Sequence, residues 1–206
     1  MIFAGFFAGA LFLGLILSDW LYFMRLTPDA SRYGCGIART HDRFTHTTIT
    51  QLASRFDAGG FLILPHGTAR LYPDLNQIVI RQQYRLFALG FRTLWPLKGL
   101  IFLSPEGDAL SVLCRKLTPW SSALLTGIWF VVVVVGMVGA LISLFVEGEL
   151  AASGGVVLGI GIVGLGFVFL LSGAIIVVFA YRLENSRLMT VYQELREVLE
   201  GVRLPS

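Results

Sequence analysis

One group of side chains in this sequence has the residue types of a metal site. His41, Asp42 and His46 fall within a stretch of six residues. Imidazole and carboxylate groups are common zinc ligands, but two histidines five positions apart align poorly on either a helix or a strand. The two cysteines, Cys35 and Cys114, are too far apart in sequence to form a paired ligand motif. The sequence therefore predicts no metal site and no cofactor.

Short motifs for nucleotide, haem or acyl-transfer chemistry are also missing. The sequence contains no GxxxxGK[ST] phosphate loop, no CxxC pair and no GxSxG turn. The glycine-rich run at 155–173 lies in apolar sequence and is unsuited to a nucleotide. We expect no enzymatic activity, and an enzyme acting on lipid at the membrane surface is the weakest alternative. Both cysteines are expected to be free thiols, because the charge distribution places them in the cytoplasm.

The composition is typical of a membrane protein. Hydrophobic residues make up 55% of the chain and charged residues 14%, whereas soluble domains carry about 25% charged residues. A bilayer core of about 30 Å needs about 20 helical residues. Three stretches meet this length: an uncleaved anchor at 1–24, then 122–145 and 155–181, the last two forming a helical hairpin within 120–181.

The distribution of basic residues predicts the orientation. Residues 25–119 hold twelve Arg or Lys, residues 182–206 hold four, and the hairpin turn holds none. The positive-inside rule places the basic side in the cytoplasm. We therefore expect a bacterial inner-membrane protein with its N-terminus outside, and with residues 25–119 and 182–206 inside. The basic excess then needs no nucleic acid to explain it.

Asp19 is the one acid within a predicted span. An ionisable group in a membrane helix is a functional candidate by default. Asp19 lies beside the aromatic-rich segment 20–23 at the cytoplasmic end, where it is expected to reach water or Arg25. No second ionisable residue in a span could complete a proton relay, which argues against a pump or channel.

The segment 25–119 is predicted to form a mainly antiparallel β domain. Thr48 and Gln51 have the spacing of a capping box, which predicts a short helix near 49–57. Apolar runs bounded by turn residues predict strands at 61–64, 68–72, 77–82, 100–103 and 109–114. The fold class is thus membrane α+β, with three transmembrane helices, a cytoplasmic β domain between the first two, and a C-terminal amphipathic helix. Either a compact sheet or a small barrel would accommodate these strands.

The apolar stretch 86–101 is not expected to cross the membrane. A crossing would bury two basic residues at about 2.5–3.5 kcal/mol each, and Pro96 would interrupt the helix. Two interpretations stay open: a buried part of the β core, or a surface that docks on lipid or a partner protein. The candidate docking residues are Arg85, Phe87, Phe91, Arg92, Leu94, Trp95 and Lys98.

Small residues recur at helical spacing in all three spans, and such faces let membrane helices approach closely. The candidate packing residues are Gly5, Gly9, Gly14, Gly136, Ala140, Gly155, Gly159, Gly166 and Gly173. They could serve contacts among the spans of this chain. Because the first span is separate from the hairpin, we also expect faces that meet another membrane protein.

An amphipathic helix is predicted at about 186–200, within the tail 182–206. Its apolar residues recur every three or four positions: Leu188, Val191, Tyr192, Leu195, Val198 and Leu199. This face could pack on the β domain, bind a partner or self-associate.

These features favour a non-catalytic accessory subunit of a larger inner-membrane complex, which packs through its spans and caps the complex on the cytoplasmic side. The predicted partners are other integral membrane subunits and the lipid bilayer, with a homo-oligomer as an open alternative. A second hypothesis is a membrane-anchored sensor or binding module whose β domain recognises a lipid, peptide or small ligand.

Overall fold

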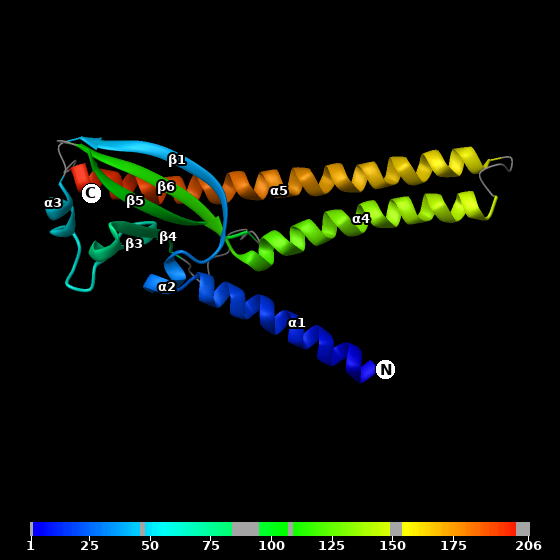
Figure 1. Ribbon diagram of the computed structural model, residues 1–206, viewed down its shortest axis with the longest axis horizontal. Helices are drawn as coiled ribbons and strands as arrows, with labels where there is room; N and C mark the ends of the chain where they lie inside the picture. The colour runs from blue at the N-terminus through cyan, green and yellow to red at the C-terminus, as the bar shows by residue number, and fades with distance from the viewer. Residues whose placement is uncertain (1, 46–47, 84–94, 107–108, 149–153, 201–206) are drawn as a thin grey trace. The chain divides into compact units, whose positions relative to one another are not determined.

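The computed structural model describes residues 2–45, 48–83, 95–106, 109–148 and 154–200 (Figure 1). The chain forms two compact units, one of residues 1–122 with 183–206 and the other of residues 123–182. The first unit contains the predicted first span, β domain and tail, because the end of the first helix and the tail both pack on the sheet.

Within the described residues, three helices are long and apolar enough to cross a membrane: α1 (Ile2–Phe23), α4 (Trp120–Val146) and α5 (Gly155–Glu200). Their most apolar windows are 6%, 6% and 11% buried within the protein, so nearly all of their apolar side chains face outward. Such an exterior is typical of helices solvated by lipid. The predicted number and positions of the apolar helices are confirmed.

In the part of the chain that the structure describes, an antiparallel sheet of six strands follows α1 and precedes α4. The strands are β1 (Cys35–Thr45), β2 (Phe61–Ile63), β3 (Gly67–Tyr72), β4 (Gln77–Gln82), β5 (Lys98–Glu106) and β6 (Ala109–Thr118). Their order is β1-β6-β5-β4-β3-β2. Among the described residues β1 and β2 do not pair with each other, so the sheet is open and the barrel alternative is not supported.

Strand β1 was not predicted from the sequence. Exposed Ile37, Arg39, His41 and Arg43 alternate with more buried residues that end in Phe44. Most of the inward positions carry small or polar side chains, so β1 lacks the apolar alternation that marks a half-buried strand. The other predicted strands are present, and β5 and β6 extend beyond their predicted limits.

Short helices lie between the longer elements. The segment α2 (Pro28–Ser31) follows α1, and α3 (Ile49–Ala53) begins at the predicted capping box, in which Thr48 and Gln51 each bond the other's backbone. The helix α3 is shorter than predicted. The predicted turn after β3 is the 3₁₀ helix η1 (Pro73–Leu75), and Asn76 ends it in the left-handed conformation with φ of 48°. Asn tolerates this conformation better than most residues.

The sheet packs on both faces. One face meets the end of α1, where Phe23 and Leu26 form a buried cluster with Val79, Leu100 and Leu117. The C-terminal part of α5 covers the other face, as seen where its red end passes behind the strands (Figure 1). The predicted tail helix at about 186–200 is the C-terminal part of α5, which continues without a break from Gly155 to Glu200, so it is not separate from the third span.

Candidate functional site

The best-defined polar feature of the protein is the junction between the C-terminal end of α1 and the sheet. Three cations from successive strands donate hydrogen bonds to backbone carbonyls just after the helix. Arg70 on β3 contacts the carbonyl of Leu26, and Arg81 on β4 donates to Met24 O at 2.5 Å. Cationic groups stabilise a helix C-terminus because they complement its dipole and its unpaired carbonyls.

Lys98 on β5 is the most buried of these cations. Its Nζ donates to Phe23 O at 3.2 Å and to Ala30 O at 2.6 Å, and it lies 4.4 Å from the centre of the Phe23 ring. The side chain is 1% exposed. Burial lowers the pKa of the Lys98 ammonium to about 8, and no carboxylate forms an ion pair with it among the described residues. A buried charge stabilised only by carbonyls and an aromatic face is costly.

Asp19 connects α1 with the first turn of α4. Its Oδ2 accepts hydrogen bonds from the backbone N of Ser121 at 2.9 Å and from Ser121 Oγ at 2.5 Å, and its Oδ1 accepts from the Tyr33 hydroxyl. The carboxylate therefore satisfies an unpaired N–H at the start of α4, as an N-cap side chain does. The hydrogen bond to Asp19 raises the pKa of Tyr33 to about 12. The expected contact of Asp19 with Arg25 is not among the hydrogen bonds and ion pairs of the described residues.

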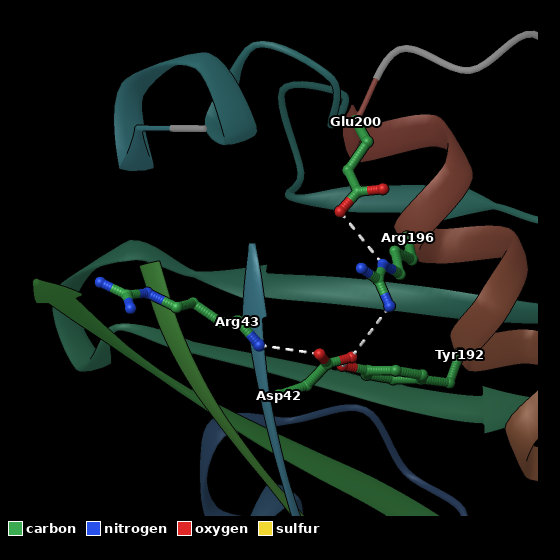
Figure 2. A network of polar contacts seen from close by, with 5 residues as sticks. All are labelled: Asp42, Arg43, Tyr192, Arg196 and Glu200. Carbon is green, nitrogen blue, oxygen red and sulfur yellow. Dashed lines mark hydrogen bonds and ion pairs between the residues drawn. The ribbon is translucent and has the colours of Figure 1, made fainter. Parts of the chain in front are cut away.

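A second polar group fixes the tail to β1. The Tyr192 hydroxyl donates to Asp42 Oδ2 at 2.9 Å, and Arg196 lies between Asp42, at 3.4 Å, and Glu200, at 3.0 Å (Figure 2). Burial and the bond to Asp42 both raise the pKa of Tyr192. The side chain of Arg43 points away from this group, so β1 presents Asp42 to the tail and Arg43 to the opposite side (Figure 2).

Further contacts extend the tail interface across the sheet. Glu194 accepts from the His66 backbone N at 3.1 Å and contacts its ring, while Lys116 donates to Asn185 Oδ1 at 2.6 Å. Gly67 lies so close to Val191 that an added Cβ would fall 2.6 Å from the Val191 side chain. The interface thus combines apolar packing with polar contacts from β1, β6 and the start of β3.

The predicted tail face lies in this interface. Leu188, Val191, Tyr192, Leu195 and Leu199 are buried and Val198 is half-buried. Of the alternatives open at the sequence level, packing on the β domain matches this burial. The apolar face is therefore not available to a partner or to a second copy of the chain.

The hairpin of α4 and α5 uses two of the predicted glycines for its own packing. A Cβ added at Gly166 would lie 2.6 Å from Met137 Sδ, and one at Gly173 would lie 2.1 Å from the Trp129 ring. Apart from the backbone of its own helix and its chain neighbours, an added Cβ would have no atom within 4 Å at Gly5, Gly9, Gly14 or Gly136, nor at the neighbouring Gly161 and Gly164. An open apolar groove of about 580 Å³, lined in part by Leu141, Gly159 and Gly164, runs along the hairpin.

Most of the predicted docking stretch lies outside the described residues, namely Arg85, Phe87, Phe91, Arg92 and Leu94. Trp95 is half-buried. Lys98 does not serve a docking surface, because it is buried and bonds to the end of α1. The sequence pattern of aromatic and basic residues does not predict the burial of Lys98, because lysine side chains are usually exposed.

Neither Arg70 nor Arg81 was singled out in the sequence. Each is an isolated basic residue in a strand, and the basic excess was attributed to orientation in the membrane. Both residues bond carbonyls at the end of α1, and this depends on strand order, because β3, β4 and β5 are adjacent in the sheet. A cation on each of three neighbouring strands is the signal that could have indicated it.

The group of His41, Asp42 and His46, in which the sequence predicted no metal site, lies only partly within the described residues. No group of three His, Cys, Asp or Glu side chains there could hold a metal ion, and His46 lies outside the described part. Asp42 is occupied by Tyr192 and Arg196. Cys35 and Cys114 are both free, and burial raises the pKa of the Cys114 thiol to about 11, which disfavours the reactive thiolate.

Comparison with known proteins identifies no relative. No protein-family model, no curated protein and no solved structure matches this chain.

Proposed function

We propose that this chain is a non-catalytic accessory subunit of a larger complex in a bacterial inner membrane. Its three apolar helices would pack against other integral membrane subunits, with the N-terminus outside and the sheet and tail in the cytoplasm. The observation that carries the proposal is the unused small-residue surface. The glycines of α1, together with Gly136, Gly161 and Gly164 of the hairpin, have open space where a neighbouring helix could approach.

The junctions of the sheet support the same role. Basic side chains from three strands donate to backbone carbonyls that follow α1, and Asp19 caps the start of α4. The tail bonds to the face of the sheet opposite α1. These contacts use polar groups to fix helices on the sheet, and none of them pairs a nucleophile with a base. The domain is built as a support, which fits a structural subunit better than an enzyme.

Purification from the native membrane in mild detergent, followed by mass spectrometry, tests this proposal. A subunit is expected to bring a fixed set of integral membrane proteins. Gly9→Leu and Gly161→Leu place bulk where the structure has open space, so they should release those partners while the chain stays folded. Val168→Leu, at a position 57% exposed on the same helix as Gly161, is the matched control. Recovery of the wild-type chain alone would contradict the proposal.

The second candidate is a membrane-anchored binding module. The open sheet favours it, because β1 forms an edge of eleven residues and its outer side carries Arg39, His41 and Arg43. A module of this kind would bind its ligand without other subunits. A chain purified alone that still binds a defined ligand would favour this candidate over the first.

A further inference from the structure

Two arginines lie directly opposite each other on the sheet. Arg39 of β1 pairs in register with Arg115 of β6, so both side chains leave the same face with Cβ atoms about 4.5–5.5 Å apart. Like charges in this position destabilise a sheet. Among the described residues no carboxylate lies within 4.0 Å of either guanidinium. Asp42, the acid nearest to Arg39 in β1, turns to the tail on the other face.

The guanidinium of Arg115 occupies a notch at Gly36. A Cβ added at Gly36 would lie 2.5 Å from Arg115 Nε and 2.7 Å from Nη2, so any other residue there would displace the group. Arg115 is half-buried and Arg39 is exposed. The absence of a side chain at Gly36 therefore leaves room for the Arg115 guanidinium, and Arg39 is the neighbour of Arg115 across the strand pair. Two such planar groups match the oxygens of a phosphate.

The notch lies at the end of the sheet that leads into α4. Gly36 is opposite Leu117, and β6 ends at Thr118, two residues before Trp120 begins the helix. At about 3.3 Å per strand residue, Leu117 stands at most roughly 10 Å from Trp120. The headgroup layer extends about 5–8 Å beyond the apolar core of a bilayer, and a long arginine side chain can extend toward it.

We propose that Arg39 and Arg115, arranged over Gly36, bind the phosphate of an anionic phospholipid from the membrane that holds the spans. This inference rests on the membrane placement of the proposed function, but it requires no protein partner. The position beside the start of α4 favours lipid over an acidic protein, because lipid phosphates surround every helix at this depth. The phosphate would offset the repulsion between the two guanidinium groups and add a lipid contact to the sheet.

The test uses the full-length protein in nanodiscs of phosphatidylcholine, with or without phosphatidylglycerol, and in detergent for titration with each lipid by native mass spectrometry. We expect preferential binding of phosphatidylglycerol. Arg39→Gln and Arg115→Gln should each weaken it about fivefold, as expected for one basic group near an anionic membrane surface. Gly36→Val should weaken it with no change in charge. Arg115→Lys should recover part of the loss, since the charge is retained without the planar fork.

Arg43→Gln is the matched control, because Arg43 is exposed on the same strand and the same side of the sheet but lies farther from α4. If Arg43→Gln weakened phosphatidylglycerol binding equally, the binding would depend on overall positive charge and not on this site, and the proposal would be overturned. Equal binding of the two lipids by the wild type would overturn it too. Competition by inorganic phosphate as effective as phosphatidylglycerol would identify a site for a free anion instead. Failure of the chain to enter nanodiscs would overturn the membrane placement and this site together, whereas a loss of partners alone concerns only the subunit proposal.

Discussion

The carboxylate of Asp19, near the end of α1, accepts a hydrogen bond of 2.9 Å from the backbone N–H of Ser121 in the first turn of α4. Two helices that are about a hundred residues apart in the chain are thereby joined through a helix cap. The same carboxylate also accepts hydrogen bonds from the hydroxyl groups of Ser121 and Tyr33. Asp19 is therefore a structural acid that accepts three hydrogen bonds, which explains why a charge is tolerated at this end of an apolar helix.

Replacement of Asp19 tests this role. Asp19→Ala leaves the Ser121 N–H and the Tyr33 hydroxyl without their acceptor, so it should lower the free energy of unfolding by about 1–3 kcal/mol. Ser121→Ala removes a single side-chain bond and should cost less. Unfolding of the purified protein in mixed detergent measures both values. If Asp19→Ala were as stable as the wild type, the cap would not contribute.

The buried Lys98 predicts a pH dependence of stability. Its pKa is about 8 in the folded protein and 10.5 when unfolded, so between these values the unfolded state binds more protons. The contribution of Lys98 to stability should therefore rise as the pH increases from about 8 to 10.5. Lys98→Met removes this contribution. Because Tyr33 and Cys114 also titrate at alkaline pH, the informative quantity is the difference in unfolding free energy between wild type and variant.

That difference should change with pH in one direction. The wild type should gain stability relative to Lys98→Met as the pH increases above about 8. Chemical unfolding at a series of pH values gives the comparison. A constant difference across this range would mean that the ammonium is hydrated in the folded protein, contrary to its burial.

The sequence predicted those features of the structure that are determined by residues close together in the chain. The capping box of Thr48 and Gln51 and the strand 77–82 were predicted correctly, because turn chemistry and apolar runs act over a few residues. Strand β1 was missed because its outer residues Arg39 and Arg43 and its inner residue Asp42 are all charged. An edge strand held by one neighbour and a helix does not need the apolar pattern of a central strand.

The junction residues could not be predicted by the same means. Lys98 was assigned to a docking surface from its aromatic and basic neighbours in sequence, whereas its contacts are Phe23 and Ala30, about 70 residues away. The tail helix was placed correctly, but the sequence left its partner open. Contacts between residues far apart in the sequence, such as Tyr192 with Asp42 and Asn185 with Lys116, identify the sheet as that partner.

The tail contact predicts different effects for two changes at Tyr192. Tyr192→Phe removes the bond to Asp42 and keeps the stacked contact with Phe44, whose ring centre lies 6.4 Å away. It should cost about 1 kcal/mol. Tyr192→Ala also removes a buried ring and should cost about 3–5 kcal/mol. Limited proteolysis of the tail, together with unfolding measurements, follows both. Equal effects would indicate that packing of the ring contributes little.

The ion pair of Arg196 with Asp42 should matter less than the tyrosine. The side chain of Arg196 is 41% exposed and that of Asp42 is 28% exposed, and their separation is 3.4 Å. Exposed pairs contribute about 0.2–1 kcal/mol. A double-mutant cycle of Asp42→Asn and Arg196→Gln should give a coupling energy in that range, and it should fall as salt is added. A coupling of several kcal/mol would contradict the exposure of the pair.

The destabilisation caused by Gly→Ala changes in the hairpin should depend on which atoms lie beside each glycine. Gly173→Ala places a methyl group 2.1 Å from the rigid Trp129 ring, whereas Gly166→Ala meets the flexible Met137 at 2.6 Å. Gly161→Ala meets no atom within 4 Å apart from its own helix backbone and chain neighbours. Overpacking costs about 1–3 kcal/mol when a side chain cannot move. Destabilisation should therefore decrease from Gly173→Ala to Gly166→Ala to Gly161→Ala, as measured by unfolding in detergent. Since Gly161→Ala is expected to leave the isolated chain unchanged, a loss of stability there would show that α5 already has a neighbour at that face.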